Sequence, residues 1–258
     1  MKEFNSSITI IGSGNVANQL VNVFSKEGVN VSHVYGRNKL TIQALADQID
    51  ADIIQDIKQL PNQLCIVCVS DDSVVEVINS IPEEIPVAYT SGSIEISAIA
   101  KRKEVGVFYP LQTFTKDRLV DFFEIPIFIE SNDEYFTSTL FELAWTISRT
   151  VEYSSSEKRA ELHLAAVFVN NFTNHIVHLA QEYATSHDID FNFLKPLLQE
   201  TIDKLDVSSA LQCQTGPAKR NDLGVINSQE SKLSGDMKKV YSALTQSIIK
   251  TYHKDDQL

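Results

Sequence analysis

The sequence predicts an α/β protein in two parts: a doubly wound, mostly parallel β-sheet over residues 1–152, followed by an all-helical domain over residues 153–258. Two observations lead to this division. Apolar, strand-like runs alternate with helix-like segments through the first part, as in sheets whose parallel strands are joined by crossover helices. After Ser154-Ser155-Ser156 the strand signals largely stop, and apolar residues recur with helical spacing.

The elements of the first part follow from these patterns. Strand-like segments predict strands at 8–11, 31–35, 64–69, 86–90, 105–109 and 126–130. Helical spacing predicts helices at 15–27, 39–49, 73–79, 94–101 and about 133–149. The third of these helices follows the capping candidates Asp71 and Asp72.

Composition limits the possible functions. A chain of 258 residues, 43% of them apolar, can bury a full core. Its net charge of −12 argues against broad binding to nucleic acids or anionic membranes. We see no signal-peptide pattern and no membrane-spanning stretch, so we expect a cytoplasmic protein. The cysteines Cys65, Cys68 and Cys213 form no metal pattern, and we expect the first two in a buried strand, pointing to opposite faces.

A glycine motif follows the first predicted strand. Residues 12–17 read Gly-Ser-Gly-Asn-Val-Ala and open directly into a helical pattern. In a Rossmann-type fold this tight turn brings backbone N–H groups and a helix N-terminus against a pyrophosphate. We therefore expect a dinucleotide to be bound here, by Gly12, Ser13, Gly14, Asn15 and Val16.

The end of the second predicted strand indicates which dinucleotide is bound. A carboxylate at this point would bond a ribose 2′-OH, whereas an arginine accepts a 2′-phosphate. The chain has Arg37 and Asn38 and no acid, which favours NADP over NAD and also disfavours a methyltransferase. Alternatively, Arg37 is only a solvated loop residue.

Further cofactor contacts are expected from loops at the carboxyl ends of later strands. The candidates are Ser70, Asp71, Ser91 and Gly92. Asp71 has an alternative role as a helix cap.

Residues 157–185 read as one long helix, without a charged residue from Leu162 to Gln181. One stripe of this helix is apolar and is expected to be core; it comprises Leu162, Ala165, Val169, Phe172, Ile176, Leu179 and Tyr183. Another face carries His163, Asn170, Asn174 and Gln181, which need polar partners if buried. This polar face is either a structural network or dimer contact, or the lining of a substrate cleft between the domains.

A second polar cluster lies at residues 215–222. Gly216-Pro217 interrupts the helical pattern, and Pro217 suits the first turn of a new helix. Thr215, Lys219 and Arg220 could hold an anionic group, with Asp222 orienting the arginine. An inter-helix turn containing a salt bridge would give the same pattern.

With these residues in view, the whole chain resembles a bacterial family that joins a Rossmann-like oxidoreductase domain to a helical C-terminal domain of unknown function. The matching stretches are Gly12–Ala17, Gly36–Asn38, Thr90–Ser93, Tyr109–Phe114, His163–Asn174 and Thr215–Asp222. The family is similar to pyrroline-5-carboxylate reductase, ketopantoate reductase and deazaflavin-dependent NADP reductases, which bind NADP in the first domain and often dimerise through the second. The resemblance implies an NADP-dependent oxidoreductase and a homodimer.

The chain departs from these relatives at residues that carry chemistry. Tyr89 and Tyr109 stand where many members have histidine, so no role of those histidines carries over. The Lys-x-x-x-Asn pair of β-hydroxyacid dehydrogenases is also missing, because Ala166 precedes Asn170 by four residues. The usual proton donor is therefore absent.

These observations lead to one mechanistic hypothesis. We expect hydride transfer between NADPH and a small C=O or C=N substrate held between the domains, with the nicotinamide near Ser91 and Gly92. His163 is the expected general acid, Asn170 and Asn174 would orient the substrate, and Arg220 would hold a carboxylate. The alternatives are a non-catalytic sensor of NADP(H) and a fold that has lost nucleotide binding.

Overall fold

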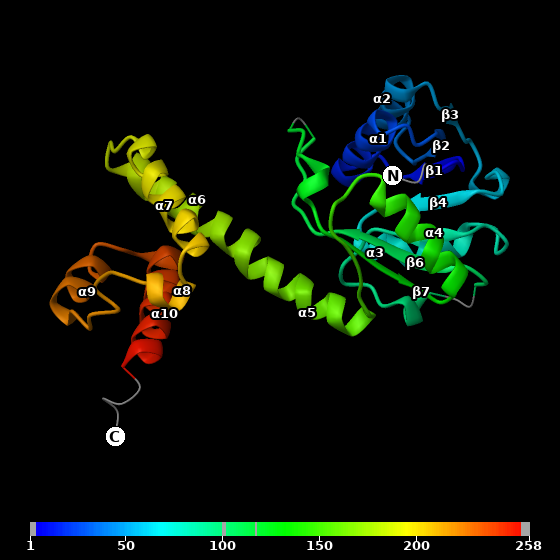
Figure 1. Ribbon diagram of the computed structural model, residues 1–258. Helices are drawn as coiled ribbons and strands as arrows, with labels where there is room; N and C mark the ends of the chain where they lie inside the picture. Colours follow the sequence, from blue (N-terminus) through cyan, green and yellow to red (C-terminus); the bar gives the residue numbers. More distant parts are fainter. Residues whose placement is uncertain (1–3, 100–101, 117, 254–258) are drawn as a thin grey trace. The chain divides into compact units, whose positions relative to one another are not determined.

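The computed structural model describes residues 4–99, 102–116 and 118–253, and the chain divides into two compact units, Met1–Asn171 and Phe172–Leu258. Figure 1 shows the sheet and its covering helices in the first unit. The sequence-based boundary between residues 152 and 153 lies within the last strand of the sheet, Val151–Tyr153. The first unit continues beyond that point because it includes the helix that follows the last strand.

The described residues of the first unit form an eight-stranded sheet of order β3-β2-β1-β4-β5-β6-β7-β8. Neighbouring strands are parallel except for the antiparallel pair β6–β7, which confirms the predicted doubly wound, mostly parallel fold. The strands are β1 (Ile8–Ile11), β2 (Val31–Tyr35), β3 (Asp52–Ile53), β4 (Leu64–Val67), β5 (Val87–Tyr89), β6 (Val105–Pro110), β7 (Ile127–Ser131) and β8 (Val151–Tyr153).

Helices cover both faces of this sheet. One buried cluster joins it to α1 (Asn15–Lys26), α2 (Lys39–Ile49) and α4 (Glu134–Trp145), and another joins it to α3 (Asp71–Ser80). The strand order reverses between β1 and β4, which makes this the switch point where α/β sheets bind ligands. The short 3₁₀ helices of the unit are η1 (Ile57–Gln59), η2 (Ile96–Ala98) and η3 (Phe122–Glu124).

Several local predictions can be compared with this architecture. Cys65 and Cys68 are buried in the two opposite clusters, as expected. The helix predicted at 94–101 is wrong over its described residues, because only η2 forms and Ile99 is already extended; residues 100 and 101 lie outside the described residues. Strands β3 and β8 were not predicted, since two or three residues are too few to show alternation.

The long uncharged helix is built from three segments: α5 (Ser156–Ala166), the π-helix η4 (Val167–Phe172) and α6 (Thr173–Ser186). Its apolar stripe was predicted to be core, and this is wrong for the single chain. Val169 is 76% exposed, Phe172 49% and Ile176 42%, because this face has little of the described chain packed on it. The lack of charged residues therefore correctly predicted an apolar face on this helix. It did not predict whether that face is buried within the single chain.

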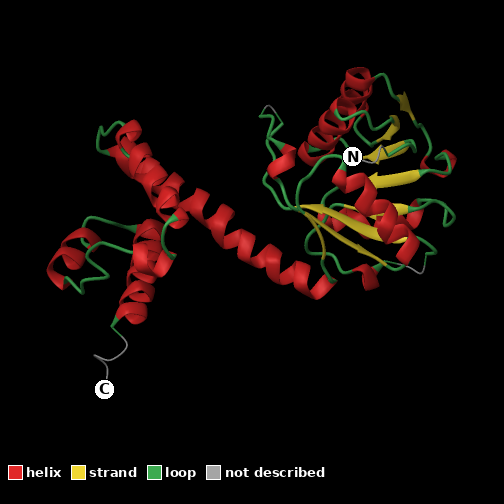
Figure 2. Ribbon diagram, in the orientation of Figure 1, coloured by secondary structure: helices red, strands yellow, loops and turns green. Residues whose placement is uncertain are grey.

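The described part of the second unit is helical and contains no strand, as Figure 2 shows. Its remaining helices are η5 (Phe191–Phe193), α7 (Lys195–Asp203), η6 (Lys204–Asp206), α8 (Ala210–Cys213), α9 (Leu223–Glu230) and α10 (Gly235–Tyr252). No helix in the described ranges is long and apolar enough to cross a membrane.

The predicted helix start at Pro217 is wrong. Gly216 has φ +104°, and residues 217–221 form a turn that ends at Asn221 with φ +55°. Helix α9 begins only at Leu223, where the Asp222 carboxylate accepts a hydrogen bond of 3.2 Å from the Val225 amide. Asp222 therefore caps a helix, which is a different role from the predicted orientation of Arg220.

The β1–α1 turn yields a stability prediction. A Cβ added at Gly12 would lie 2.2 Å from the Cys68 carbonyl oxygen, on a backbone with φ +116°. We expect Gly12→Ala to destabilise the first unit by about 2–4 kcal/mol, because strain and overpacking act together. Urea unfolding followed by the fluorescence of Trp145, the sole tryptophan, measures this.

Gly14→Ala is the matched control, since a Cβ there meets no atom within 4 Å. We expect it to cost at most about 1 kcal/mol. Equal unfolding midpoints for the two variants would contradict the close contact at Gly12.

Candidate cofactor and active site

The turn between β1 and α1 leaves backbone N–H groups available at the start of α1. The Gly12 amide donates to the Tyr35 carbonyl (2.8 Å), and this fixes the turn beside the end of β2. Helix α1 has no side-chain cap at Gly14 and no acidic residue in its first turn. Unsatisfied amides together with the helix dipole attract anions, so this turn fits the diphosphate of a dinucleotide.

Other residues predicted to bind the cofactor lie around this turn. Ser13 Oγ is hydrogen-bonded to Thr41 Oγ1 at 2.7 Å, and Asn15 Nδ2 donates to the Phe114 carbonyl at 2.8 Å. Asn38 Oδ1 caps α2 by accepting from the Leu40 and Thr41 amides. Arg37 is exposed at the end of β2, next to this cap.

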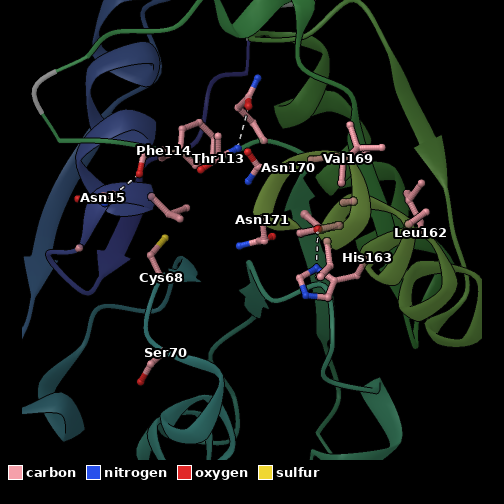
Figure 3. Close-up of a pocket in the computed structure, with 18 of the residues that line it drawn as sticks. Asn15, Cys68, Ser70, Thr113, Phe114, Leu162, His163, Val169, Asn170 and Asn171 are labelled. Carbon is pink, nitrogen blue, oxygen red and sulfur yellow. Dashed lines mark hydrogen bonds between the residues drawn. The ribbon is translucent and has the colours of Figure 1, made fainter. Parts of the chain in front are cut away.

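A cavity of about 850 Å³ extends from this turn to helix α5, entirely within the first unit. Figure 3 shows Asn15 and Ser70 on one side of it and His163, Asn170 and Asn171 on the other. Its lining comprises Gly14, Asn15, Val16, Cys68, Val69, Ser70, Tyr109, Leu111, Gln112, Thr113, Phe114, Leu162, His163, Ala165, Ala166, Val167, Val169, Asn170 and Asn171. Four of the predicted cofactor residues and two of the predicted catalytic residues therefore line one cavity.

The chemistry of this cavity centres on Tyr109 and His163. The Tyr109 hydroxyl lies 3.0 Å from His163 Nδ1, within hydrogen-bond distance. Both side chains pack over Gly92, where an added Cβ would lie 2.6 Å from Tyr109 Cζ and 2.9 Å from His163 Nδ1. Gly92 thus gives the pair the space it occupies, and the pair can relay a proton into the cavity.

The surroundings of Tyr109 keep its hydroxyl protonated. Burial raises the pKa of Tyr109, and the carboxylate of Asp71 adds to the rise, while the positive charge of Arg159 opposes it. A raised pKa means that the neutral phenol persists through and above neutral pH. Burial likewise raises the pKa of Cys68 to about 12, so this thiol in the cavity wall is not a thiolate nucleophile.

The loop after β5 carries the other predicted contacts. Ser91 is buried, and its hydroxyl accepts hydrogen bonds of 3.2 Å from the Ser93 and Ile94 amides. Ser93 Oγ donates to Asp71 Oδ2 at 2.5 Å, which ties this loop to the start of α3. Asp71 lies within the first turn of α3 and does not cap it, so the alternative capping role is wrong.

Two adjacent amide side chains, Asn170 and Asn171, enter the cavity lining from η4. Only Asn170 was predicted. In an α-helix, neighbouring residues point about 100° apart, so Asn171 was not expected to share a face with Asn170. The two residues lie in a π-helical segment, and such segments frequently occur at functional sites. A π segment leaves no clear pattern in the sequence, which is why Asn171 was missed.

Tyr109 was also not among the predicted site residues, although it lines the cavity. It lies near the carboxyl end of β6, in a strand that runs parallel to β5. Ligands bind at this edge of parallel sheets, so its position alone could have identified it.

Asn174 and Arg220 belong to the second unit and do not line this cavity. Lys219, expected beside Arg220 in an anion site, donates to the Gln214 carbonyl at 2.7 Å and lies over the Tyr252 ring. In the described ranges, no group of three or more His, Cys, Asp or Glu side chains is placed to hold a metal ion.

In comparisons with known proteins, two families match separate parts of the chain. The family described as "NADP oxidoreductase coenzyme F420-dependent" matches residues 7–101, and a domain of unknown function, DUF2520, matches residues 125–248. A crystal structure titled as a "putative NADP oxidoreductase" from Bacteroides fragilis is 35% identical, with a TM-score of 0.88. The alignment covers 96% of this chain and 99% of that one.

More distant structures share the fold. A protein from Thermotoga maritima is 18% identical with a TM-score of 0.73, over 97% of this chain and 100% of that one. A reductive aminase from Aspergillus terreus, solved with NADPH and ethyl-5-oxohexanoate, is 16% identical with a TM-score of 0.69, over 95% and 94%. No functionally curated protein matches the sequence.

Proposed function

The chain belongs to the same family as the Bacteroides fragilis protein titled as a "putative NADP oxidoreductase", and from this premise we propose that it transfers a hydride between NADP(H) and a small carbonyl or imine compound. Family membership makes it an NAD(P)-dependent oxidoreductase; the substrate class and the residue roles are our proposal. One observation carries it. A single cavity joins the open amides of the β1–α1 turn to the hydrogen-bonded pair Tyr109–His163.

The cofactor would be held along the carboxyl edge of the sheet. The amides of Gly14, Asn15 and Val16 would bond the diphosphate, with Gly12 and Ser13 shaping the turn. Arg37 would pair with the 2′-phosphate, and Asn38 Nδ2 would donate a neutral hydrogen bond beside it. Ser70, Asp71, Ser91 and Gly92 would border the nicotinamide half.

In the reductive direction, bound NADPH supplies the hydride. The protein then has to place a proton on the oxygen or nitrogen that gains negative charge. Imidazole is the side chain that exchanges protons in the neutral range, and His163 lies against a phenol that stays protonated. We assign His163 as the general acid and Tyr109 as its hydrogen-bonded partner.

Neutral amides would orient the substrate beside this pair. Asn170 and Asn171 line the cavity and can donate to, or accept from, a carbonyl or imine group. The roles of Asn174 in orienting the substrate and of Arg220 in holding a carboxylate remain sequence-based proposals.

We also propose a homodimer formed through the helical second unit. Large apolar side chains of this unit are exposed in the single chain: Leu197 is 67% exposed, Leu211 58% and Ile202 53%. Exposed apolar surface of this kind is typical of interfaces. Light scattering should give about twice the chain mass of 28.9 kDa, with Leu197→Glu shifting it toward one chain. A wild-type mass of one chain would contradict this proposal.

Cofactor preference tests the role of Arg37. Calorimetry should show tighter binding of NADPH than of NADH, and Arg37→Ala should weaken NADPH binding by about 10- to 100-fold while leaving NADH binding unchanged. Lys26→Ala, an exposed lysine at the far end of α1, is the matched control. Equal affinity of the wild type for NADPH and NADH would contradict the assignment of Arg37 to the 2′-phosphate.

Turnover tests the roles of His163 and Tyr109. With a panel of ketoacids, ketones and cyclic imines, His163→Ala and Tyr109→Phe should lower the rate of NADPH oxidation by about 10²- to 10⁴-fold, with the NADPH Kd unchanged. Tyr135→Phe, which alters a tyrosine that is 78% exposed, should have no effect. An unchanged rate in His163→Ala would refute its assignment as general acid.

The alternative function is a non-catalytic NADP(H) sensor. The missing Lys-x-x-x-Asn pair favours it, since the relatives' proton donor is absent. NADPH binding without turnover across the whole panel would favour the sensor over the enzyme.

A further inference from the structure

A buried ion pair holds the start of helix α5 against the sheet. The guanidinium of Arg159 on α5 contacts the carboxylate of Glu130 on β7, and their side chains are only 1% and 9% exposed. The same guanidinium donates to the Ile94 carbonyl at 2.5 Å and to Ser156 Oγ at 3.3 Å. Arg159 therefore joins the helix both to a strand and to the loop after β5.

Ser156 adds a second connection at the first turn of α5. Its hydroxyl donates to Glu130 Oε2 at 2.8 Å and accepts from the Ile96 amide at 3.1 Å. The loop thus held includes Ile94, whose amide bonds Ser91 next to Gly92. The first turn of α5 is therefore joined by hydrogen bonds to the loop after β5, and Gly92 of this loop packs against Tyr109 and His163.

Stability alone is a poor explanation for this arrangement. Burying two charges costs several kcal/mol of desolvation each, and an apolar pair of similar size is often as stable or more stable. Among the residues that the structure describes, the buried Arg159 Nε–H has no hydrogen-bond partner, which adds to the cost. The buried Glu130–Arg159 pair therefore calls for a role other than stability, such as positioning helix α5.

The strand register supports this positioning role. Glu130 on β7 is paired directly with Val107 on β6, and Tyr109 lies two residues beyond Val107. Directly paired residues share a face of the sheet, and so do residues two apart on one strand. Glu130 and Tyr109 therefore project from the same face, on adjacent strands.

The helix continues the same geometry. His163 follows Arg159 by four residues, about one turn, so both lie on the same side of α5. Arg159 meets Glu130, and one turn later His163 meets Tyr109 at 3.0 Å. A hydrogen bond of this length is lost after a displacement of about 1 Å, so the helix has to be fixed close by.

We propose that the Glu130–Arg159 ion pair is a positioning device that fixes α5 so that His163 stays hydrogen-bonded to Tyr109 in the arrangement that delivers the proton. This inference rests on the proposed oxidoreductase function. Arg159 is a positioning residue, since it does not line the cavity. In addition, its positive charge acts on Tyr109 in the direction that lowers the pKa, against burial and Asp71.

The test separates position from activity. In protein with ¹⁵N-labelled histidine, the Nδ1 signal of His163, identified by its absence in His163→Ala, reports the hydrogen bond to Tyr109. We expect Arg159→Met to shift this signal and to lower kcat by about 10- to 100-fold, while the NADPH Kd stays within about twofold. Arg159→Lys should have a kcat between those of Arg159→Met and the wild type. Lysine keeps the positive charge but lacks the planar guanidinium that donates to several acceptors at once.

Lys158→Met is the matched control. Lys158 is the neighbouring residue on α5 and forms an exposed ion pair with Glu161. We expect it to change neither the His163 signal nor kcat, since exposed pairs contribute little.

Glu130→Asp is a second variant, chosen in case Arg159→Met does not fold. It shortens the acidic side chain of the ion pair by one methylene group and keeps both charges. It should shift the His163 signal and lower kcat in the same direction as Arg159→Met. If folded Glu130→Asp and Arg159→Met proteins keep the wild-type His163 signal and kcat, the positioning role is overturned. If the wild type turns over no substrate, the proposed function fails, and the His163 signal alone still decides the positioning role.

Discussion

The rest of the site depends on the close approach of Gly12, in the β1–α1 turn, to the carbonyl oxygen of Cys68. Gly12 can make this approach because it has no Cβ and adopts φ +116°. The turn lies where the strand order reverses, beside the carboxyl end of β4, which is paired with β1. Helix α1 consequently starts at the edge of the sheet with its first amides uncapped. A larger residue at position 12 would push the turn away from β4 and misdirect those amides.

The opposite wall of the cavity has a different origin. Helix α5 lies beyond the last strand in sequence, yet Arg159 and Ser156 hold it to β7 and to the loop after β5. This places His163 against Tyr109, with Gly92 leaving room for both rings. In the proposed function, backbone geometry would set the cofactor side of the site, and a buried charge pair would set the side that carries the general acid. The proposed reaction would use both, because it moves a hydride and a proton to one substrate.

Much of this could be predicted from sequence, for identifiable reasons. β1 was placed at its observed bounds because it is a short apolar run next to turn residues, and β2 because Val31, Val34 and Tyr35 form a strand-like segment between turn residues. His163 and Asn170 were singled out because buried polar residues on an uncharged helix need partners, and both line the cavity; their catalytic roles stay a prediction. The place of Asn171 in the cavity lining depends on a π-helical turn, and the role that we propose for Arg159 depends on the pairing of β6 with β7; neither leaves a local pattern in the sequence. The helix predicted from Pro217 failed because Gly216 and Asn221 enclose a tight turn instead.

A titration of ¹⁵N-labelled protein with NADP⁺, followed through backbone amide resonances, tests the central claim most directly. Amides that bond a diphosphate change their chemical environment on binding, whereas distant amides do not. The account predicts saturable shifts that are largest at Gly14, Asn15 and Val16, with further shifts at Gly92. Saturable binding that leaves these four amides unchanged would contradict it.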